Sequence, residues 1–381
     1  MTRPERTLFA FIFGLAFASG GLSVAPAAER PPRYQVDPSW PKDMPNHYVM
    51  ANVGGLAVDA QDHVWILSRP RNLEKSAFLG LQAEPPISEC CRAAPAVVEF
   101  DASGNFIQAW GGPQKPGETP AYEWPQSEHG ITVDHKGNVW VCGNGSGDNH
   151  CLKFTRDGKF LLQIGRSGAS KGSLDPDNLN RAAQVAVWPK TNEVFIADGY
   201  GNRRVIVFDA DSGKFKRMWG AYGNKPDDAF KEPDPSQRAV GSPPAQFGLV
   251  HGIGISKDGL VYVSDRTNNR VQVFTIEGKF VKEGFVARPT LMRRGTAFST
   301  AFSAGDQRYL FVGDSPSYKV RILDRASLEE VSAFGRGGAY PGQFHGLHLI
   351  AADSQGNIYT GDAPGESPAA AGRVQKFVLQ K

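Results

Sequence analysis

The chain has 381 residues, 40% of them hydrophobic, which is enough to bury the core of one large domain or two ordinary ones. Its formal net charge of +3 is nearly neutral and its Lys and Arg residues are scattered, which argues against a nucleic-acid partner. The 43 Gly, 27 Pro and 23 Phe residues favour many short strands and tight turns over long helices.

The N-terminal residues are typical of an export signal. Two arginines precede an apolar run at residues 8–18, and small residues around Pro26 resemble a cleavage site. The run is shorter than the roughly 20 residues that cross a membrane, although a membrane anchor stays an alternative. We therefore expect a signal peptide at residues 1–28, a single domain without a membrane span at residues 29–381, and a secreted or periplasmic protein.

A seven-residue strand pattern with an aromatic residue in its third place occurs six times. The copies are HVWILSR (63–69), NVWVCGN (138–144), EVFIADG (193–199), LVYVSDR (260–266), YLFVGDS (309–315) and NIYTGDA (357–363). An alternating segment precedes each copy, another follows it, and a fourth comes after a turn, so a repeat holds four strands. Since no helical periodicity interrupts them, the sequence predicts an all-β, six-bladed β-propeller.

The last repeat lacks its fourth strand, because the chain ends after RVQKFVLQK. We expect RYQVD at residues 33–37 to supply that strand, so that pairing of the two chain ends closes the ring. The two longest insertions, residues 70–95 and 221–246, are rich in Pro, Gly and charge and are expected to be surface loops.

Four cysteines are present, and an exported protein can oxidise them. Cys142 and Cys151 flank a turn and could bridge the two strands of a hairpin. The adjacent Cys90 and Cys91 could form a vicinal disulfide, and a single bridge with two buried free thiols is the alternative. No CxxC pair exists, which argues against a zinc finger.

Three histidines share a His-Gly-aliphatic setting: His129 in SEHGITV, His251 in LVHGIGI and His345 in QFHGLHL. Each stands at the start of the first strand of blade 2, 4 or 6. First strands line the channel of a propeller, so the three imidazoles are expected to surround one point on its axis. Three histidines with an open fourth position are typical of catalytic zinc. The alternative is that His-Gly is merely a common start of the first strand in this repeat, and that these histidines bind no ligand. His348 is expected to point to the opposite side and to pack.

Charged and phenolic residues are expected at the rim of the channel. Arg69 and Arg266 occupy the last place of the seven-residue pattern in blades 1 and 4, which lie opposite each other. Their guanidinium groups could hold a carboxylate or an oxyanion, although Arg266 could instead pair with Asp265. Tyr200 follows the same place in blade 3, where a phenol near a cation could act as a base. The alternative is an ordinary tyrosine in a surface turn.

The segments DGYGNRRVIVFD and SDRTNNRVQVF look like NHL repeats. From about Arg33 to its end, the chain resembles the peptidyl-α-hydroxyglycine α-amidating lyase (peptidylamidoglycolate lyase) family. The resemblance implies a six-bladed propeller that holds Zn2+ with three histidines, which are carried onto His129, His251 and His345. It further implies Tyr200 as the catalytic tyrosine of the D-G-Y-x-N motif.

The same resemblance implies two site arginines, Arg69 in LSRP and Arg266 in SDRTNN. The family's structural Ca2+ uses an Asp directly after the third histidine, and Gly346 stands there, so a calcium ion loses that ligand. The cysteine beside the family's tyrosine is replaced by Gly201, so the family's disulfides do not carry over. No copper monooxygenase domain accompanies the repeats.

The sequence thus predicts a zinc-dependent carbon–nitrogen lyase that acts on a small-molecule or peptide carbinolamide, which is an α-hydroxy amide. The products would be an amide and glyoxylate or a similar oxo acid. The alternative is a non-catalytic NHL scaffold that binds a protein or a small ligand on one face of the propeller. Calcium-dependent lactone hydrolysis would need carboxylates at the axis, where this chain has histidines instead.

Overall fold

The computed structural model describes residue 1 and residues 30–73, 77–113, 121–363 and 372–380. All but residue 1 of the expected signal peptide at residues 1–28 lies outside the described residues. Among the described residues, no helix has both the length and the apolar character needed to cross a membrane.

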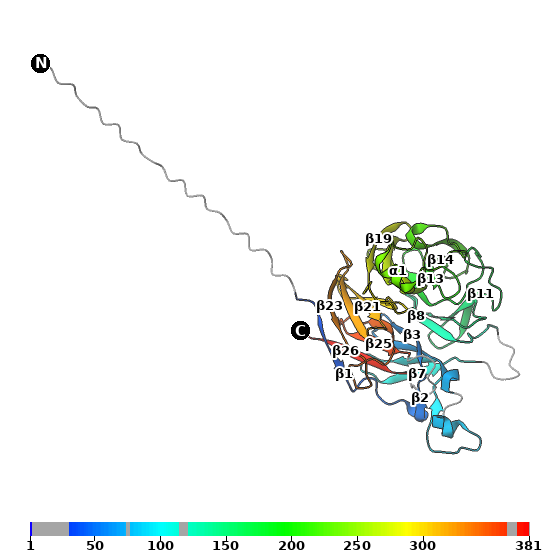
Figure 1. Cartoon of the computed structure of the whole chain (residues 1–381). Coiled ribbons are helices and arrows are strands. Elements are labelled where there is room, and N and C mark those ends of the chain that lie inside the picture. Colours follow the sequence, from blue (N-terminus) through cyan, green and yellow to red (C-terminus); the bar gives the residue numbers. More distant parts are fainter. Residues whose placement is uncertain (2–29, 74–76, 114–120, 364–371, 381) are drawn as a thin grey trace. The chain divides into compact units, whose positions relative to one another are not determined.

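From Pro32 onward, the described residues form six four-stranded antiparallel sheets (Figure 1), which confirms the predicted propeller. Blade 1 contains β3 (Val53–Val58), β4 (Val64–Ser68), β6 (Val97–Phe100) and β7 (Phe106–Trp110). Blade 2 contains β8 (Glu128–Val133), β9 (Val139–Gly143), β10 (His150–Phe154) and β11 (Phe160–Gly165). Blade 3 contains β12 (Gln184–Trp188), β13 (Glu193–Asp198), β14 (Arg204–Asp209) and β15 (Phe215–Trp219).

The second half of the ring repeats the same arrangement. Blade 4 contains β16 (Val250–Ile255), β17 (Leu260–Asp265), β18 (Arg270–Thr275) and β19 (Phe280–Phe285). Blade 5 contains β20 (Ser299–Phe302), β21 (Tyr309–Asp314), β22 (Lys319–Asp324) and β23 (Glu330–Phe334). Blade 6 contains β24 (Leu347–Ala352), β25 (Ile358–Asp362), β26 (Val374–Gln380) and β1 (Arg33–Asp37).

The two ends of the propeller meet in blade 6, as predicted. The N-terminal strand β1 pairs antiparallel with the C-terminal β26, from Arg33 opposite Gln380 to Asp37 opposite Lys376. Figure 1 shows the two strands side by side, blue against red. This pairing gives blade 6 its fourth strand and covers an edge of β26 that would otherwise be open.

The first strands of neighbouring blades contact one another all the way round the ring, in the order β3, β8, β12, β16, β20, β24 and back to β3. These strands are therefore the innermost ones. A β-bulge interrupts their pairing with the second strand beside His129 in β8, at His251 in β16 and at His348 in β24. A bulge changes the direction in which a side chain points, and here it does so at the channel.

Most of the hydrophobic core lies in six clusters, one between each pair of adjacent blades. The aromatic residue in the third place of the repeat is fully buried in every blade: Trp65, Trp140, Phe195, Tyr262, Phe311 and Tyr359. In three blades it donates a hydrogen bond to the aspartate that begins the preceding turn, which is Asp59, Asp134 or Asp353. In these three blades the contact fixes the turn against the core.

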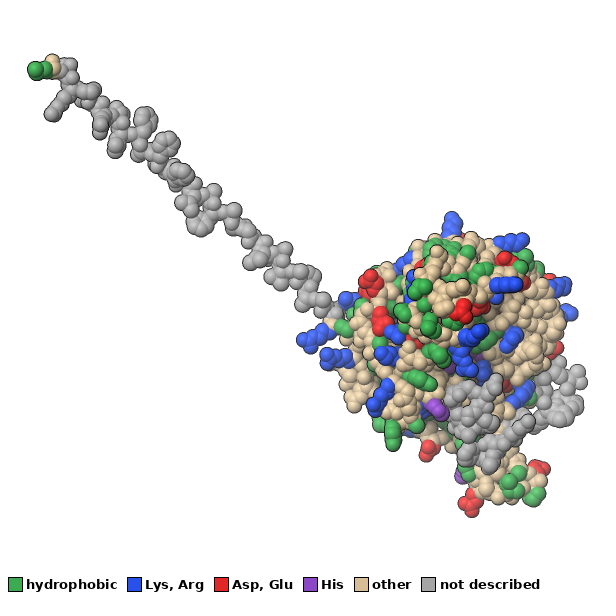
Figure 2. All heavy atoms as spheres, in the orientation of Figure 1, with side chains coloured by type: hydrophobic (Ala, Val, Ile, Leu, Met, Phe, Trp, Pro, Cys, Tyr) green, Lys and Arg blue, Asp and Glu red, His purple; other side chains and the backbone are tan. Residues whose placement is uncertain are grey.

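The connections carry short elements. The strands β2 (Tyr48–Val49) and β5 (Arg92–Ala93) pair in parallel outside the blades. The insertions expected to be plain surface loops contain the 3₁₀ helices η2 (Pro70–Leu73), η3 (Ala77–Gln82) and η4 (Ala221–Gly223) and the helix α1 (Pro235–Val240). Two more 3₁₀ helices are η1 (Pro45–His47) and η5 (Arg266–Asn268). Basic and acidic side chains are interspersed on the face of the molecule that Figure 2 shows.

Both cysteine pairs are disulfides. Cys142 of β9 and Cys151 of β10 are directly opposite each other, with their Cα atoms 4.3 Å apart, and both are fully buried. Cys142 is also the strand partner of His129, so this disulfide supports the strand that carries one of the central histidines. Cys90 and Cys91 form the second bridge.

Candidate functional site

Three buried histidines meet at the centre of the ring: His129 of β8, His251 of β16 and His348 of β24. Their ring centroids form a nearly equilateral triangle with sides of 5.0, 5.1 and 4.9 Å. One ligand atom from each histidine lies within 4.8 Å of those of the other two. Because the three strands belong to alternate blades, the imidazoles converge with threefold symmetry.

The other ring nitrogen of each histidine is held by the next blade. The Nδ1 atoms of His129, His251 and His348 lie 2.7, 2.5 and 2.9 Å from carbonyl oxygens of Ala183, Phe298 and Val53. A carbonyl oxygen can only accept, so each Nδ1 carries the proton and donates. The Nε2 atoms therefore keep their lone pairs, and these point toward one another. Fixing the tautomer in this way is typical of histidines that bind a metal.

Burial holds the three imidazoles in the neutral form. It lowers the pKa of His348 to about 3, and the positive charge of Arg69 acts in the same direction. Burial likewise lowers the pKa of His129 well below the ordinary value, with Arg69 contributing, and that of His251, with Arg266 contributing. Three neutral donors facing one point are a suitable site for a divalent cation.

The third histidine differs from the expectation. His345 is exposed and precedes β24, and its backbone N–H donates to Asp362 at 3.0 Å. His348, expected to pack on the opposite side, takes the central place instead. The reason is the strand start: β24 begins at Leu347, so its second residue, the one beside the bulge, is His348. His129 and His251 are likewise the second residues of their strands, as predicted for the centre.

A fixed spacing could have identified His348. The residues Asp134, Ser256 and Asp353 each begin the turn that ends the first strand, and the backbone N–H of each donates to the residue four places on. His129, His251 and His348 stand five residues before these turn residues, whereas His345 stands eight before Asp353. The His-Gly dipeptide was a weaker guide than the distance to the turn.

Tyr200 brings its phenol to the same centre, as predicted. It lies in the loop after β13, and its Oη is 3.2 Å from His129 Nε2 and 3.0 Å from His251 Nε2. The Nη1 of Arg266 donates to the same Oη at 3.1 Å. One hydroxyl proton cannot satisfy two Nε2 lone pairs, so at least one of them stays without a donor from Tyr200.

The two predicted arginines also lie at the site. Arg266 is buried, donates from Nε to the carbonyl of Arg294 at 2.8 Å and stacks over Phe298, with Cζ 4.1 Å from the ring centroid. It does not pair with Asp265, whose carboxylate binds Arg270 instead. Burial lowers the pKa of Arg266 and of Arg69.

Arg69 is half-buried at the end of β4, and its Nε donates to the carbonyl of Glu128 at 2.8 Å. Its Nη2 lies 3.5 Å from the side-chain oxygen of Asn144. Sequence reasoning missed a further arginine, Arg181, whose Cζ lies 5.8 Å from the centroid of the Tyr200 ring. No repeat motif contains Arg181, because it stands in the connection before β12, so no signal in the sequence marked it.

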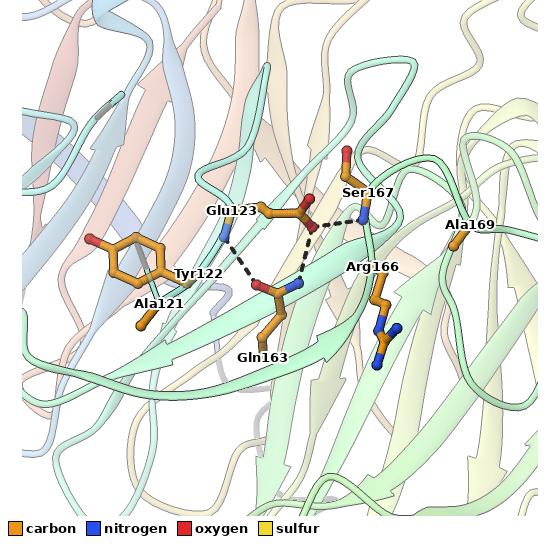
Figure 3. Close-up of a pocket in the computed structure, with 7 residues that line it drawn as sticks. All are labelled: Ala121, Tyr122, Glu123, Gln163, Arg166, Ser167 and Ala169. Carbon is orange, nitrogen blue, oxygen red and sulfur yellow. Dashed lines mark hydrogen bonds between the residues drawn. The ribbon is translucent and has the colours of Figure 1, made fainter. Parts of the chain in front are cut away.

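Two other features of the described residues lie apart from this site. Asp59, His63 and Glu99 form a second group with metal-ligand atoms, but Arg156 bonds to all three side chains and occupies the place that a cation would take. A cavity of about 460 Å³ lies on blade 2. Among its lining residues in Figure 3, Glu123 accepts hydrogen bonds from the side chain of Gln163 and the backbone N–H of Ser167. Neither feature contains a residue of the histidine centre.

Comparison with known proteins agrees with this architecture. The sequence model of the NHL repeat matches residues 247–274. A peptidylglycine alpha-amidating monooxygenase from Rattus norvegicus is 29% identical over 340 residues, which is 84% of this chain but only 30% of that protein's length. A probable peptidyl-alpha-hydroxyglycine alpha-amidating lyase from Caenorhabditis elegans is 27% identical, and the match covers 69% of this chain and 67% of that one.

Two further similarities concern repeats and fold. NHL repeat-containing protein 3 from Homo sapiens is 26% identical, with 64% of this chain and 56% of that protein covered. The structure of a streptogramin B lyase superposes with a TM-score of 0.50 at 13% identity and covers 91% of this chain and 98% of that one, a likeness of fold alone. The chain is a six-bladed β-propeller that matches the NHL repeat at residues 247–274 and resembles the peptidyl-α-hydroxyglycine α-amidating lyases.

Proposed function

We propose that this chain is an exported zinc-dependent lyase that cleaves the C–N bond of an α-hydroxy amide, giving an amide and glyoxylate or a similar oxo acid. The observation that carries the proposal is the convergence of three Nε2 lone pairs, from His129, His251 and His348, on one point. All three Nδ1 atoms bond to backbone carbonyls, so the imidazoles have no proton of their own on Nε2 to separate the lone pairs. A bound cation removes that repulsion.

The donor spacing suits zinc. Two nitrogens bound to one tetrahedral zinc at 2.0–2.1 Å stand about 3.3 Å apart, and the Nε2 atoms of His251 and His348 are separated by 3.3 Å. Three imidazole ligands leave a fourth position for a substrate atom, as in catalytic zinc sites. Bound zinc would supply positive charge that makes a neighbouring hydroxyl group more acidic.

The side chains around the histidines would carry out the proton transfer and hold the substrate while the C–N bond breaks. The substrate's hydroxyl proton passes to the Tyr200 oxygen, which Arg266 Nη1 stabilises in its charged form. The electron pair of the O–H bond forms the new C=O bond, and the C–N bond breaks with its pair on nitrogen. A proton then returns to that nitrogen, which completes the amide. The forks of Arg69 and Arg266 hold the carboxylate of the departing oxo acid.

The names of the relatives support the reaction class, whereas the substrate has to be identified by experiment. Relatives from rat and nematode are named for peptide amidation, while the human relative is named only for its repeats. Two disulfides support the proposal of export, because disulfides persist in oxidising compartments.

The test is turnover of α-hydroxyhippurate by the zinc-loaded protein, followed as release of benzamide and glyoxylate. We expect turnover that a chelator abolishes and added zinc restores. The competing function is a non-catalytic scaffold that binds a protein or a ligand on one face. A well-folded protein that binds no zinc and turns over no hydroxy amide would contradict the lyase and favour the scaffold.

A further inference from the structure

Three guanidinium groups around Tyr200 are anchored in the same way. Arg69, Arg181 and Arg266 each donate from Nε to a backbone carbonyl, those of Glu128, Asn144 and Arg294, at 2.8, 2.9 and 2.8 Å. Anchoring through Nε holds the plane of the guanidinium and leaves the terminal nitrogens to bind something else. The Cζ atoms of Arg181 and Arg266 lie 5.8 and 5.9 Å from the centroid of the Tyr200 ring.

None of the three arginines forms an ion pair within the described part of the chain. The ion pairs that other arginines make at the starts of third strands show the contrast: Arg204 with Asp198, Arg270 with Asp265, Arg321 with Asp314 and Arg373 with Asp362. A cation in a partly buried site is costly unless an anion pairs with it. The three unpaired guanidiniums therefore indicate that anions come from a ligand.

Arg181 also has an unusual backbone conformation. Its backbone has a φ of 63°, in the left-handed region where a side chain other than Gly or Asn is disfavoured. Its N–H donates to the carbonyl of Asp148 and its own carbonyl accepts from the N–H of Tyr200, so the conformation is fixed on both sides. Unfavourable backbone conformations are concentrated at functional sites. This conformation therefore supports a functional role for the Arg181 side chain.

Asn144 couples Arg181 to the substrate-binding arginines. The backbone oxygen of Asn144 accepts from Arg181, and its side-chain oxygen lies 3.5 Å from Arg69 Nη2. Arg181 thus belongs to the same cluster as Arg69 while its terminal nitrogens have no protein partner among the described residues. If the substrate had a single carboxylate, bound by Arg69 and Arg266, the guanidinium group of Arg181 would have no anion to bind.

We infer that Arg181 determines substrate specificity by binding a second anionic group on the acyl half of the substrate. The inference rests on the proposed function, because that function assigns the oxo-acid carboxylate to Arg69 and Arg266. The substrate class is accordingly a dianionic N-acyl-α-hydroxyglycine, with one carboxylate on each side of the bond that breaks.

Binding without turnover tests the inference. N-succinylglycine and N-succinamoylglycine differ only in a terminal carboxylate or amide, and neither carries the hydroxyl group that the lyase needs. Calorimetry on the zinc-loaded protein should show that N-succinylglycine binds about tenfold to a hundredfold more tightly, as expected for charge-assisted hydrogen bonds. The variant Arg181→Asn should lose this preference, and Asn tolerates the left-handed backbone, so the variant should stay folded.

The control is Arg166→Gln, which removes an exposed arginine that lines the separate cavity of Figure 3 and should keep the preference. Equal affinity of the wild-type protein for both ligands, or an unchanged preference in Arg181→Asn, would overturn the inference. Turnover of α-hydroxyhippurate tests the proposed function separately. If no hydroxy amide is cleaved while N-succinylglycine still binds through Arg181, the lyase fails and the anion site remains as a ligand site.

Discussion

The Nε2 atoms of His251 and His348 lie 3.3 Å apart at the centre of the ring. Each histidine gives its only proton, on Nδ1, to a backbone carbonyl of the neighbouring blade. Two lone pairs at this distance repel each other, and burial opposes protonation of either ring. A metal cation held between them would turn the repulsion into coordination.

Removal of the Tyr200 hydroxyl should affect catalysis while leaving the histidines in place. In Tyr200→Phe we expect kcat to fall by about 10²- to 10⁴-fold, the usual contribution of a general base. Metal content should not change, because three imidazole nitrogens are sufficient to hold zinc. Glyoxylate release and metal analysis measure the two effects. Tyr340→Phe, at an exposed tyrosine, is the control, and equal kcat in both variants would contradict the role of Tyr200.

The two site arginines should give different kinetic signatures. Arg69→Gln should raise KM for α-hydroxyhippurate about tenfold or more, because a charge-assisted contact to the carboxylate is lost. Arg266→Gln should raise KM and also lower kcat, since Arg266 donates to the Tyr200 oxygen. Steady-state kinetics separate the two parameters. An unchanged KM in both variants would show that the carboxylate binds elsewhere.

The metal-free protein should lose stability as the pH falls. The folded-state pKa of His348 is about 3, against 6.5 for an unperturbed histidine, and those of His129 and His251 are also lowered. Between these values the unfolded chain binds more protons than the folded one, so the free energy of unfolding decreases as the pH falls from about 6.5 toward 3. Urea titrations across this range measure it.

The same titrations on the triple variant His129→Gln, His251→Gln, His348→Gln provide the comparison for that pH dependence. Without the buried imidazoles, the decrease between pH 6.5 and 3 should become shallower, leaving the contribution of the carboxylates. An identical slope with and without the histidines would mean that these rings do not titrate as their burial indicates.

The disulfide between Cys142 and Cys151 should stabilise blade 2. It closes a short loop, and removal of a bridge of this span costs about 2–3 kcal/mol in the chain-entropy account. The double variant Cys142→Ala, Cys151→Ala should therefore unfold at lower urea concentration, with a reductant-treated wild-type protein as the comparison. Unfolding at an unchanged urea concentration would show that packing around these buried positions supplies the stability on its own.

The fold could be predicted because each repeat carries its own local evidence. Third-place aromatics such as Trp65 and Trp140 fill the space between blades, and turns such as the one at Asp134 set the strand ends, so six copies reveal six blades. Closure by β1 followed from counting strands, since the last repeat was one short.

The site could be predicted only where a residue stands at a repeat position. His129, His251, Arg69, Arg266 and Tyr200 do, and the structure brings them together. The sequence predicted His345 at the centre, whereas the structure has His348 there. The start of β24 and its bulge decide which side chain reaches the axis, and a His-Gly dipeptide reveals neither of them. Arg181 lies in a connection with an unusual backbone conformation, which depends on contacts with Asp148 and Tyr200 that only the folded chain contains.

The most direct test of the account is the zinc content of two matched variants, His348→Ala and His345→Ala, purified with zinc and dialysed against a weak chelator. The account predicts one zinc per chain in the wild-type protein and in His345→Ala, and none in His348→Ala, which should remain folded because only one imidazole is removed. Zinc retained by His348→Ala, or lost from His345→Ala alone, would contradict the histidine centre described here.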